Sequence, residues 1–338
     1  MGKPRIFVTP SGKLQEQLFL PRVREELASF ADPTYNQKEE RLTSEELAAL
    51  LPGYQGLLTG WGAPQLTPAV LDAASKLRMV AHAAGTIKFL LPDPPSDFFR
   101  RGLKMSTATP TMARYVAEHA ICLAIACLRR VSSFREEMKG TDLWWGSHSG
   151  PEPDTIIEKR VGMVGLGLIS WEMVRMLKPF GCEVWAYSKH GDRKRAEAEG
   201  VKLVELDDLM RNCPVIFMMA AVRPDTIKMI NRERLKLIPD GAVFVNTARG
   251  AIIDEEALVE ELKTGRFYAG IDVTEPEPPA ADSPLRTLPN VLLTPHVGGP
   301  VPSRYWDMAM FAAQELGRFF RGEPLQGEVT ERRLEGMA

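Results

Sequence analysis

The chain of 338 residues carries 42 Lys and Arg against 44 Asp and Glu, and 44% of its residues are hydrophobic. At roughly 100–200 residues per domain, this length predicts two folded domains and excludes a disordered chain, while a net charge of −2 gives no reason to expect nucleic acid or an anionic membrane as partner. We expect a cytoplasmic protein, because no apolar run is expected to reach the roughly 18 residues of a membrane span and the N-terminus lacks a secretion signal.

Short apolar segments alternate with amphipathic segments over the first third of the chain. The strand candidates are Arg5–Thr9, Gly56–Gly60 and Leu77–Ala84. The helix candidates between them are Leu14–Phe30 and Thr67–Ser75. Strands separated by helices predict a parallel sheet that is covered on both faces.

The segment Met112–Arg130 is apolar nearly all round and predicts a helix buried between layers. A second alternation follows, with strand candidates at 160–164, 183–187, 215–219, 242–246, 269–272 and 291–294, helix candidates at 170–179, 207–211, 231–237 and 255–264, and a last helix at 303–321. We therefore expect a second, larger sheet in a domain of residues 111–301, with residues 1–110 and 302–338 forming the other domain.

The segment 161–170, VGMVGLGLIS, joins a predicted strand to a predicted helix through a glycine-rich turn. Gly165 would allow the tight turn, and Gly167 would let the backbone approach a pyrophosphate at the helix N-terminus, beside Leu168 and Ile169. The third glycine of the dinucleotide fingerprint is replaced by Ser170. The alternative is a glycine-rich turn that binds no ligand.

Three polar side chains follow successive strands of the second sheet, at the edge where such sheets bind ligands. They are Arg249, Glu277 and His296. Arginine presents two parallel donors to a carboxylate, histidine exchanges protons near neutral pH, and a glutamate stabilises the charged imidazole. Glu275 is the alternative to Glu277, since both lie in one proline-rich loop.

With these motifs, the sequence resembles the D-isomer-specific 2-hydroxyacid dehydrogenase family over nearly its whole length. The resemblance also rests on GLKMSTATPTMARYVAEH (102–119), RPDTIKMI (223–230), LIPDGAVFVNTARGAIIDEEALVEEL (237–262) and AGIDVTEPEP (269–278). The last of these is most similar to the glyoxylate/hydroxypyruvate reductase branch. The resemblance implies an α/β fold of two doubly wound parallel-sheet domains, a Rossmann nucleotide domain at 111–301 and a flavodoxin-like substrate-binding domain, with a cleft between them.

The resemblance further implies an NAD(P)-dependent oxidoreductase that transfers a hydride between the nicotinamide and a small 2-oxo or 2-hydroxy acid. Arg249 would orient the substrate, and His296 would be the general acid/base with Glu277 as its partner. Asp272 would hold the nicotinamide carboxamide, and the implied cofactor contacts also include Thr226, Thr247, Ala248 and Gly298. The alternative is a non-catalytic, dinucleotide-sensing regulatory protein of the same fold, similar to co-repressors.

The substrate carboxylate would meet backbone amides at Gly85 and Thr86. This segment departs from the family pattern AGVGxD, because residues 83–88 read AAGTIK. Trp61, which follows a strand of the first domain, would line the substrate pocket. Trp61, Trp144 and Trp145 could restrict the pocket to small acids, with one tryptophan reaching a neighbouring subunit of a homodimer; alternatively, all three only pack a core or an interface.

Cofactor choice depends on the end of the second nucleotide-domain strand, where NAD-specific relatives carry an acidic residue. Here that position is Ser188, with Lys189 beside it and Arg193 nearby. These residues favour NADP over NAD through contacts to the 2′-phosphate. Asp192 is the alternative ribose ligand, which would restore NAD use.

No metal site is expected, because no histidine pair or Cys/His cluster has ligand spacing. The four cysteines have no paired spacing and are expected to be reduced core thiols. His119, within the apolar helix, is expected to be a hydrogen-bonded packing residue.

Overall fold

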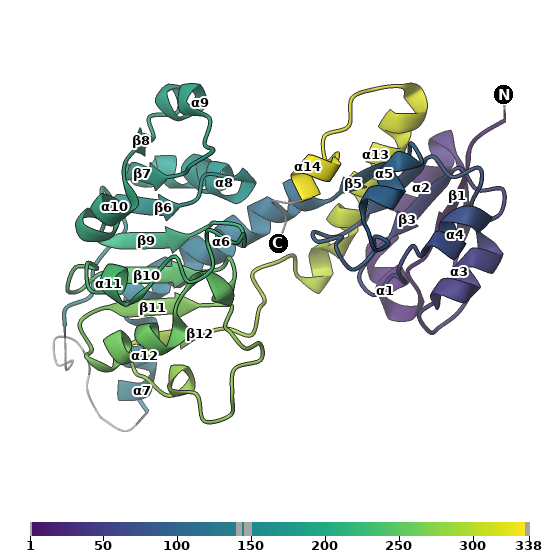
Figure 1. Cartoon of the computed structure of the whole chain (residues 1–338). Coiled ribbons are helices and arrows are strands. Elements are labelled where there is room, and N and C mark those ends of the chain that lie inside the picture. Colours follow the sequence, from purple (N-terminus) through teal and green to yellow (C-terminus); the bar gives the residue numbers. More distant parts are fainter. Residues whose placement is uncertain (1, 140–143, 145–150, 335–338) are drawn as a thin grey trace. The chain divides into compact units, whose positions relative to one another are not determined.

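The computed structural model describes residues 2–139, 144 and 151–334, and these residues form two compact units. One unit contains the described residues of the ranges 1–112 and 300–337, and the other contains those of the range 113–299. Each unit is built on a parallel sheet (Figure 1). The expected fold class, α/β with two parallel sheets, is confirmed.

The N-terminal unit has a five-stranded sheet in the order β2-β1-β3-β4-β5. Its strands are β1 (Arg5–Val8), β2 (Asp32–Tyr35), β3 (Gly56–Thr59), β4 (Met79–His82) and β5 (Lys104–Thr107). Its helices are α1 (Gly12–Leu18), α2 (Pro21–Phe30), α3 (Ser44–Leu50), α4 (Pro68–Ala73), α5 (Ser96–Arg100), α13 (Tyr305–Arg321) and α14 (Glu331–Leu334), with a 3₁₀ turn η4 at Pro302–Arg304. The carboxyl ends of all five strands lie at one edge, because every pairing is parallel.

Alternate residues of these strands face two layers of helices. Phe7, Leu57 and Val80 pack in one core with side chains of α3, α4 and α5. On the other face α13 contacts α2, β3 and β4. The helix expected over Leu14–Phe30 is two helices, because Pro21 lacks the N–H that a continuous helix needs and instead begins α2.

The C-terminal unit has a seven-stranded sheet in the order β12-β11-β10-β9-β6-β7-β8. Its strands are β6 (Arg160–Val164), β7 (Glu183–Tyr187), β8 (Lys202–Leu203), β9 (Val215–Met218), β10 (Val243–Asn246), β11 (Tyr268–Ile271) and β12 (Val291–Leu293). Its helices are α6 (Thr109–Leu128, which begins in the other unit), α7 (Val131–Glu137), α8 (Leu168–Leu177), α9 (Arg193–Ala198), α10 (Leu206–Asn212), α11 (Arg232–Leu235) and α12 (Glu255–Lys263), with 3₁₀ turns η1 (Lys178–Phe180), η2 (Gly250–Ile252) and η3 (Pro284–Arg286).

Two separate cores lie on the two faces of this sheet. Ile216 and Phe244 pack with α10, α11 and α12, whereas Phe217 and Val245 pack with α6 and α8. This alternation along β9 and β10 is the signature of strands that are buried on both faces. The seven strands therefore hold their carboxyl ends, where the candidate residues lie, on a rigid support.

The expectation that no segment is long and apolar enough to span a membrane is wrong for helix α6. By length and composition alone this 20-residue helix could cross one, although 44% of its apolar window is buried. Ala117, Ala120, Leu123 and Ala124 of α6 pack into the same core as α8. This packing accounts for the apolar residues on the buried side of the helix, since a helix face that packs into a core is apolar.

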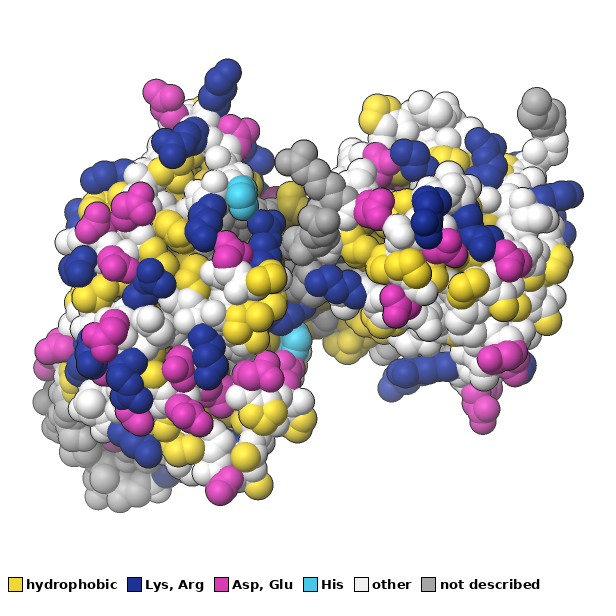
Figure 2. Space-filling model, in the orientation of Figure 1, with side chains coloured by type: hydrophobic (Ala, Val, Ile, Leu, Met, Phe, Trp, Pro, Cys, Tyr) yellow, Lys and Arg dark blue, Asp and Glu magenta, His cyan; other side chains and the backbone are white. Residues whose placement is uncertain are grey.

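Charged side chains of both signs are interspersed over the described part of the face drawn in Figure 2. The cysteines divide in their exposure: Cys127 and Cys213 are buried, Cys182 is half-buried and Cys122 is exposed. The expectation of core thiols is therefore wrong for Cys122. Burial raises the pKa of Cys127 and of Cys213 to about 12, so both stay protonated at neutral pH.

We expect His82, at the end of β4, to make the stability of the protein depend on pH. A hydrogen bond of 2.8 Å joins its Nδ1 to Thr59 Oγ1, and its Nε2 is buried without a partner among the described residues. Burial lowers the pKa of His82 to about 4, from 6.5 for the free side chain. Because the unfolded chain takes up the proton more readily, the stability that neutral His82 contributes is present above pH 6.5 and is lost as pH falls toward 4.

We expect the free energy of unfolding to fall by about 2 kcal/mol between pH 7 and pH 5 through this residue. His82→Gln should remove that part of the pH dependence, as measured by urea unfolding at both pH values. The matched control is His190→Gln, at an exposed histidine. Equal pH dependence in the wild type and His82→Gln would contradict the assignment.

Candidate active site

Arg249, Glu277 and His296 follow three neighbouring strands of the C-terminal unit. Arg249 follows β10, Glu277 follows β11, and His296 follows β12, and these strands lie side by side in the sheet. Since the strands are parallel, their carboxyl ends bring the three loops to one edge.

The imidazole of His296 contacts the carboxylate of Glu277 through its Nδ1 atom and Oε1. Both side chains are partly exposed, 46% for His296 and 40% for Glu277. The Nδ1 contact leaves Nε2 of His296 available to exchange a proton with a ligand. Glu275 lies elsewhere: its backbone N–H donates to the carboxylate of Glu255 at 2.8 Å. Of the two candidates in this loop, Glu277 contacts His296 and Glu275 makes no such contact within the described part of the chain.

Arg249 is half-buried and lies close enough to Glu277 for that carboxylate to act on its charge. Its Nη1 donates to the carbonyl oxygen of Ala248 at 2.6 Å. Burial lowers the pKa of Arg249, whereas the charge of Glu277 raises it; an arginine remains protonated in either case. Gly250 allows this loop to approach the next one, because a Cβ there would lie 2.2 Å from the carbonyl oxygen of Thr274. The cation is thus held close to the Glu277 loop.

Asp272, just after β11, organises the loop that carries His296. Its carboxylate accepts hydrogen bonds from Thr294 Oγ1 at 2.6 Å and from the N–H groups of Val297 and Gly298 at 2.9 Å. Burial alone raises the pKa of Asp272, but hydrogen bonds from His119, Thr294 and the two amides outweigh it and lower the pKa to about 2. The Asp272 carboxylate is therefore ionised and already accepts hydrogen bonds from its own chain. A nicotinamide carboxamide would donate to it in addition to these groups.

The same loop holds His296 in an unusual backbone conformation. Its φ of +52° lies in the left-handed region, which non-glycine residues seldom occupy. The N–H of His296 donates to the carbonyl oxygen of Asp272 at 2.9 Å. The network around Asp272 therefore fixes both the backbone and the approach of the imidazole to Glu277.

His119 of α6, which was expected to be a packing residue, contacts the residues that hold the His296 loop. Its Nε2 is 3.2 Å from Thr294 Oγ1 and 3.4 Å from Asp272 Oδ1. Since Thr294 donates its proton to Asp272, His119 donates its Nε2–H in this arrangement. Sequence reasoning missed this contact because His119 and Asp272 lie far apart in the chain.

The glycine-rich turn fits a dinucleotide. Gly165 has φ +105°, and a Cβ there would lie 2.7 Å from the backbone nitrogen of Ala220. Gly167 precedes the first turn of α8, which contains Leu168 and Ile169, and its missing Cβ faces open space. Backbone N–H groups at such a helix start favour a phosphate. Ser170 takes the third glycine's place, since it is buried and donates to the carbonyl oxygen of Gly165 at 2.8 Å.

The loops after β9 and β10 carry three of the expected cofactor contacts, of which some make hydrogen bonds within the described part of the chain and one does not. Thr247 Oγ1 is buried without a partner among the described residues, as a hydroxyl that meets a bound ligand would be. The Ala248 N–H donates to Asn246 Oδ1 at 3.1 Å. Thr226 turns inward, because its Oγ1 donates to the Ala221 carbonyl and accepts from the Arg223 N–H, both at 2.7 Å.

The residues expected to select the cofactor follow β7. Ser188 is half-buried, and Lys189 donates to Asp225 at 2.7 Å, so its charge is paired within the chain. Asp192 precedes α9 and accepts from the Arg195 N–H at 3.1 Å, so it is engaged as the N-cap of that helix. Arg193 is exposed in the first turn of that helix.

The expected substrate residues Gly85, Thr86 and Trp61 belong to the N-terminal unit. Gly85 and Thr86 follow β4, and Trp61 follows β3 and contacts the ring of Tyr305 at 4.8 Å between centroids. Trp144 is 79% exposed, and Trp145 lies outside the described residues. Within the described part of the chain no group of three or more His, Cys, Asp or Glu side chains could hold a metal ion.

Comparison with protein families gives one match over more than half of the chain. Residues 121–298 match the model described as "D-isomer specific 2-hydroxyacid dehydrogenase, NAD binding domain". The match begins within α6 and ends at Gly298, so it includes the glycine-rich turn and the loops of Arg249, Glu277 and His296.

Two curated relatives and one solved structure are similar to the chain. D-3-phosphoglycerate dehydrogenase of Archaeoglobus fulgidus is 29% identical over 86% of this chain, which spans about half (54%) of that protein's length. Human glyoxylate reductase/hydroxypyruvate reductase is 29% identical over 90% of this chain and 93% of that protein. A phosphoglycerate oxidoreductase from Rhizobium etli has a TM-score of 0.80, with 97% of this chain and 99% of that chain covered, and at 23% identity it supports the fold alone.

Proposed function

Because this chain belongs to the D-isomer-specific 2-hydroxyacid dehydrogenase family, and is an NAD-binding oxidoreductase by that membership, we propose that it reduces small 2-oxo acids of the glyoxylate and hydroxypyruvate type. The observation that carries the proposal is the cluster of Arg249, Glu277 and His296 at the carboxyl ends of β10, β11 and β12. The match to the human glyoxylate reductase/hydroxypyruvate reductase over 93% of its length supports this substrate class.

In this mechanism each of the three side chains has one task. The half-buried guanidinium of Arg249 binds the substrate's carboxylate and carbonyl oxygens and stabilises negative charge that develops on the carbonyl oxygen. His296 donates a proton from Nε2 to that oxygen, while Glu277 holds its Nδ1 and stabilises the charged ring. A bound nicotinamide cofactor supplies the hydride.

The residues of the N-terminal unit have supporting tasks in the proposal. Backbone amides at Gly85 and Thr86 bind the substrate carboxylate, and the ring of Trp61 limits the size of the substrate. The protein acts as a homodimer in the cytoplasm. Exposure of 79% of Trp144 favours the dimer, because a large exposed aromatic side chain is typical of an interface.

A panel of 2-oxo acids tests this function. We expect kcat/KM to be highest for glyoxylate or hydroxypyruvate and much lower for phenylpyruvate. A higher value for phenylpyruvate would contradict the size restriction, and a higher value for phosphohydroxypyruvate would assign the chain to the phosphoglycerate dehydrogenase reaction. No turnover of any 2-oxo acid, with dinucleotide still bound, would favour the sensor instead.

We further propose a preference for NADP(H) over NAD(H), by at least roughly tenfold in kcat/KM, or about 1.4 kcal/mol. The Ser188 position carries no carboxylate, and Asp192 is engaged as a helix cap. Arg193 is exposed and has no ion pair among the described residues, so it can meet a 2′-phosphate. Lys189 contributes less than its sequence position suggested, since Asp225 pairs with it.

Ser188→Asp should reverse this preference by repelling the 2′-phosphate, and Arg193→Gln should weaken NADPH use while leaving NADH use unchanged. Lys194→Gln, at the adjacent exposed cation, is the matched control. The measurement is kcat/KM for NADPH and for NADH on one substrate. Equal values in the wild type would overturn the assignment.

A further inference from the structure

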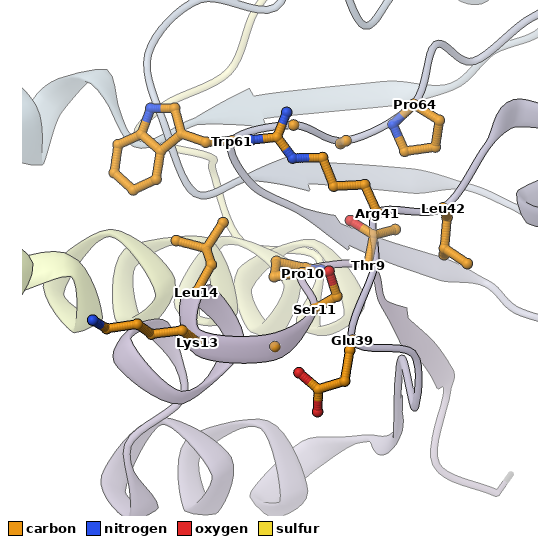
Figure 3. A pocket seen from close by; sticks show the side chains of 13 residues that line it. Thr9, Pro10, Ser11, Lys13, Leu14, Glu39, Arg41, Leu42, Trp61 and Pro64 are labelled. Atoms are coloured by element: carbon orange, nitrogen blue, oxygen red, sulfur yellow. The ribbon is translucent and has the colours of Figure 1, made fainter.

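The N-terminal unit contains a cavity of about 220 Å³ (Figure 3), and of the residues with a task in the proposed reaction only Trp61 lines it. It is lined by the segment that joins β1 to α1, by the chain before α3, and by the turn after β3. Its walls are thus made by residues that are distant in the sequence, as in a preformed ligand pocket.

The position of the cavity in the sheet is that of a ligand site. From β1 the chain first adds β2 on one side and then crosses back to add β3, β4 and β5 on the other side. The loops after β1 and β3 therefore diverge, and in open parallel sheets ligands bind in the crevice that this change of direction leaves at the carboxyl ends. Thr9 and Pro10 line the cavity just after β1, and Trp61 and Gly62 line it just after β3.

The cavity is lined by three charged side chains that are unpaired within the described part of the chain. Lys13, Glu39 and Arg41 all line it, and none of them makes a hydrogen bond or ion pair with the described part of the chain. The Arg41 guanidinium lies against Gly62, where a Cβ would be 2.6 Å from its central carbon. Gly62 therefore makes room for this cation at the cavity wall. Two cations and one carboxylate leave the cavity with a net positive charge.

The other walls suit a carbon skeleton and a hydroxyl group. Figure 3 shows the Trp61 ring and the Leu14 side chain on the same side of the cavity, with Arg41 above and Glu39 below. The Trp61 ring is supported by the ring of Tyr305. Ser11, whose hydroxyl makes no helix-capping hydrogen bond, also lines the cavity.

We propose that this cavity binds a small hydroxylated organic acid through its phosphate or carboxylate group. Arg41 binds the anionic group with its two parallel donors, and Lys13 adds charge at the rim. Trp61 and Leu14 cover the carbon skeleton, and Glu39 accepts a hydrogen bond from a ligand hydroxyl. The ligand is either a separate effector or the distal part of an extended substrate, since both would present the same chemistry. The second source would replace the size limit proposed for Trp61, whereas the first leaves it in place.

The binding test uses inorganic phosphate as probe and needs no turnover, so it is independent of the proposed function. Equilibrium dialysis of radiolabelled phosphate is carried out at pH 8 with saturating NADPH, which keeps the cofactor site filled. We expect Arg41→Gln to weaken phosphate binding by about tenfold, the loss of one charge-assisted contact. Glu39→Gln should strengthen binding, because it removes the one negative charge.

Lys76→Gln, at an exposed lysine of the same unit outside the cavity, is the matched control and should bind phosphate as the wild type does. Unfolding midpoints of the three variants verify that each is folded. No saturable binding to the wild type, or equal binding by the wild type and Arg41→Gln, would overturn the proposal. Inhibition of glyoxylate reduction then separates the two sources: competition by phosphate indicates the distal part of a substrate, and any other pattern indicates an effector.

Discussion

Replacing His296 with alanine should lower kcat by about 10²–10⁴-fold and leave cofactor binding nearly intact. The imidazole is the one group in the cluster that can both donate and accept a proton near neutral pH, and it contacts Glu277 rather than the glycine-rich turn. The measurement is single-turnover reduction of glyoxylate together with a fluorescence titration of the reduced cofactor. Near-wild-type turnover by His296→Ala would exclude His296 as the general acid.

Two glutamate variants provide a matched test of the same mechanism. Glu277→Gln should lower kcat, since the amide cannot stabilise a charged imidazole, although less than His296→Ala does. Glu275→Gln, two residues earlier in the same loop, should retain wild-type kcat because the described contact of Glu275 is made by its backbone N–H. The reverse order of effects would assign the partner role to Glu275.

Arg249→Ala should lower kcat by about 10²–10³-fold and also raise KM for the 2-oxo acid. The guanidinium is proposed to contact the substrate both in the ground state, through its carboxylate, and in the transition state, through the carbonyl oxygen, so both constants should change. Arg249→Lys retains the charge but loses the two parallel donors, and it should recover only part of the activity.

Arg232→Lys is the matched control for Arg249→Lys. Arg232 is exposed and paired with Glu260 in the same unit, so its replacement should leave both constants unchanged. An Arg249→Ala variant with an unchanged KM and kcat would show that substrate is held by other groups, and the cluster would then lose its proposed role.

The sequence by itself determined the elements whose causes are local. Gly165 is required by a positive φ and a close backbone approach, and strands such as β6 and β9 are continuous apolar runs because both of their faces are buried. The polar residues in the loops after β10, β11 and β12 were recognisable because each loop follows a short apolar run, and the loops at the carboxyl ends of parallel strands lie at one edge of the sheet. The parallel fold and the composition of the cluster follow from such signals.

Three of the four edge strands, β2, β5 and β8, were not predicted from the sequence, whereas the fourth, β12, was. Strands β2 and β5 lie at the two edges of their sheet, and β2 reads DPTY, a segment with a proline and without an apolar pattern. Proline is tolerated in a strand at an edge, where one side of the backbone needs no partner. Such a segment becomes a strand only because β1 supplies the hydrogen bonds.

Choices between similar residues also required the tertiary structure. Glu275 and Glu277 differ in sequence by two positions, and only the path of the loop brings Glu277 to His296 and Glu275 to Glu255. The sequence presents Lys189 as a cation without a partner, but in the structure Asp225, from the loop after β9, pairs with it. Likewise, the contact of His119 with Asp272 joins a helix and a strand end that are distant in the chain. A side chain's charge and type are local properties, whereas its partner depends on which segments the folded sheet brings together.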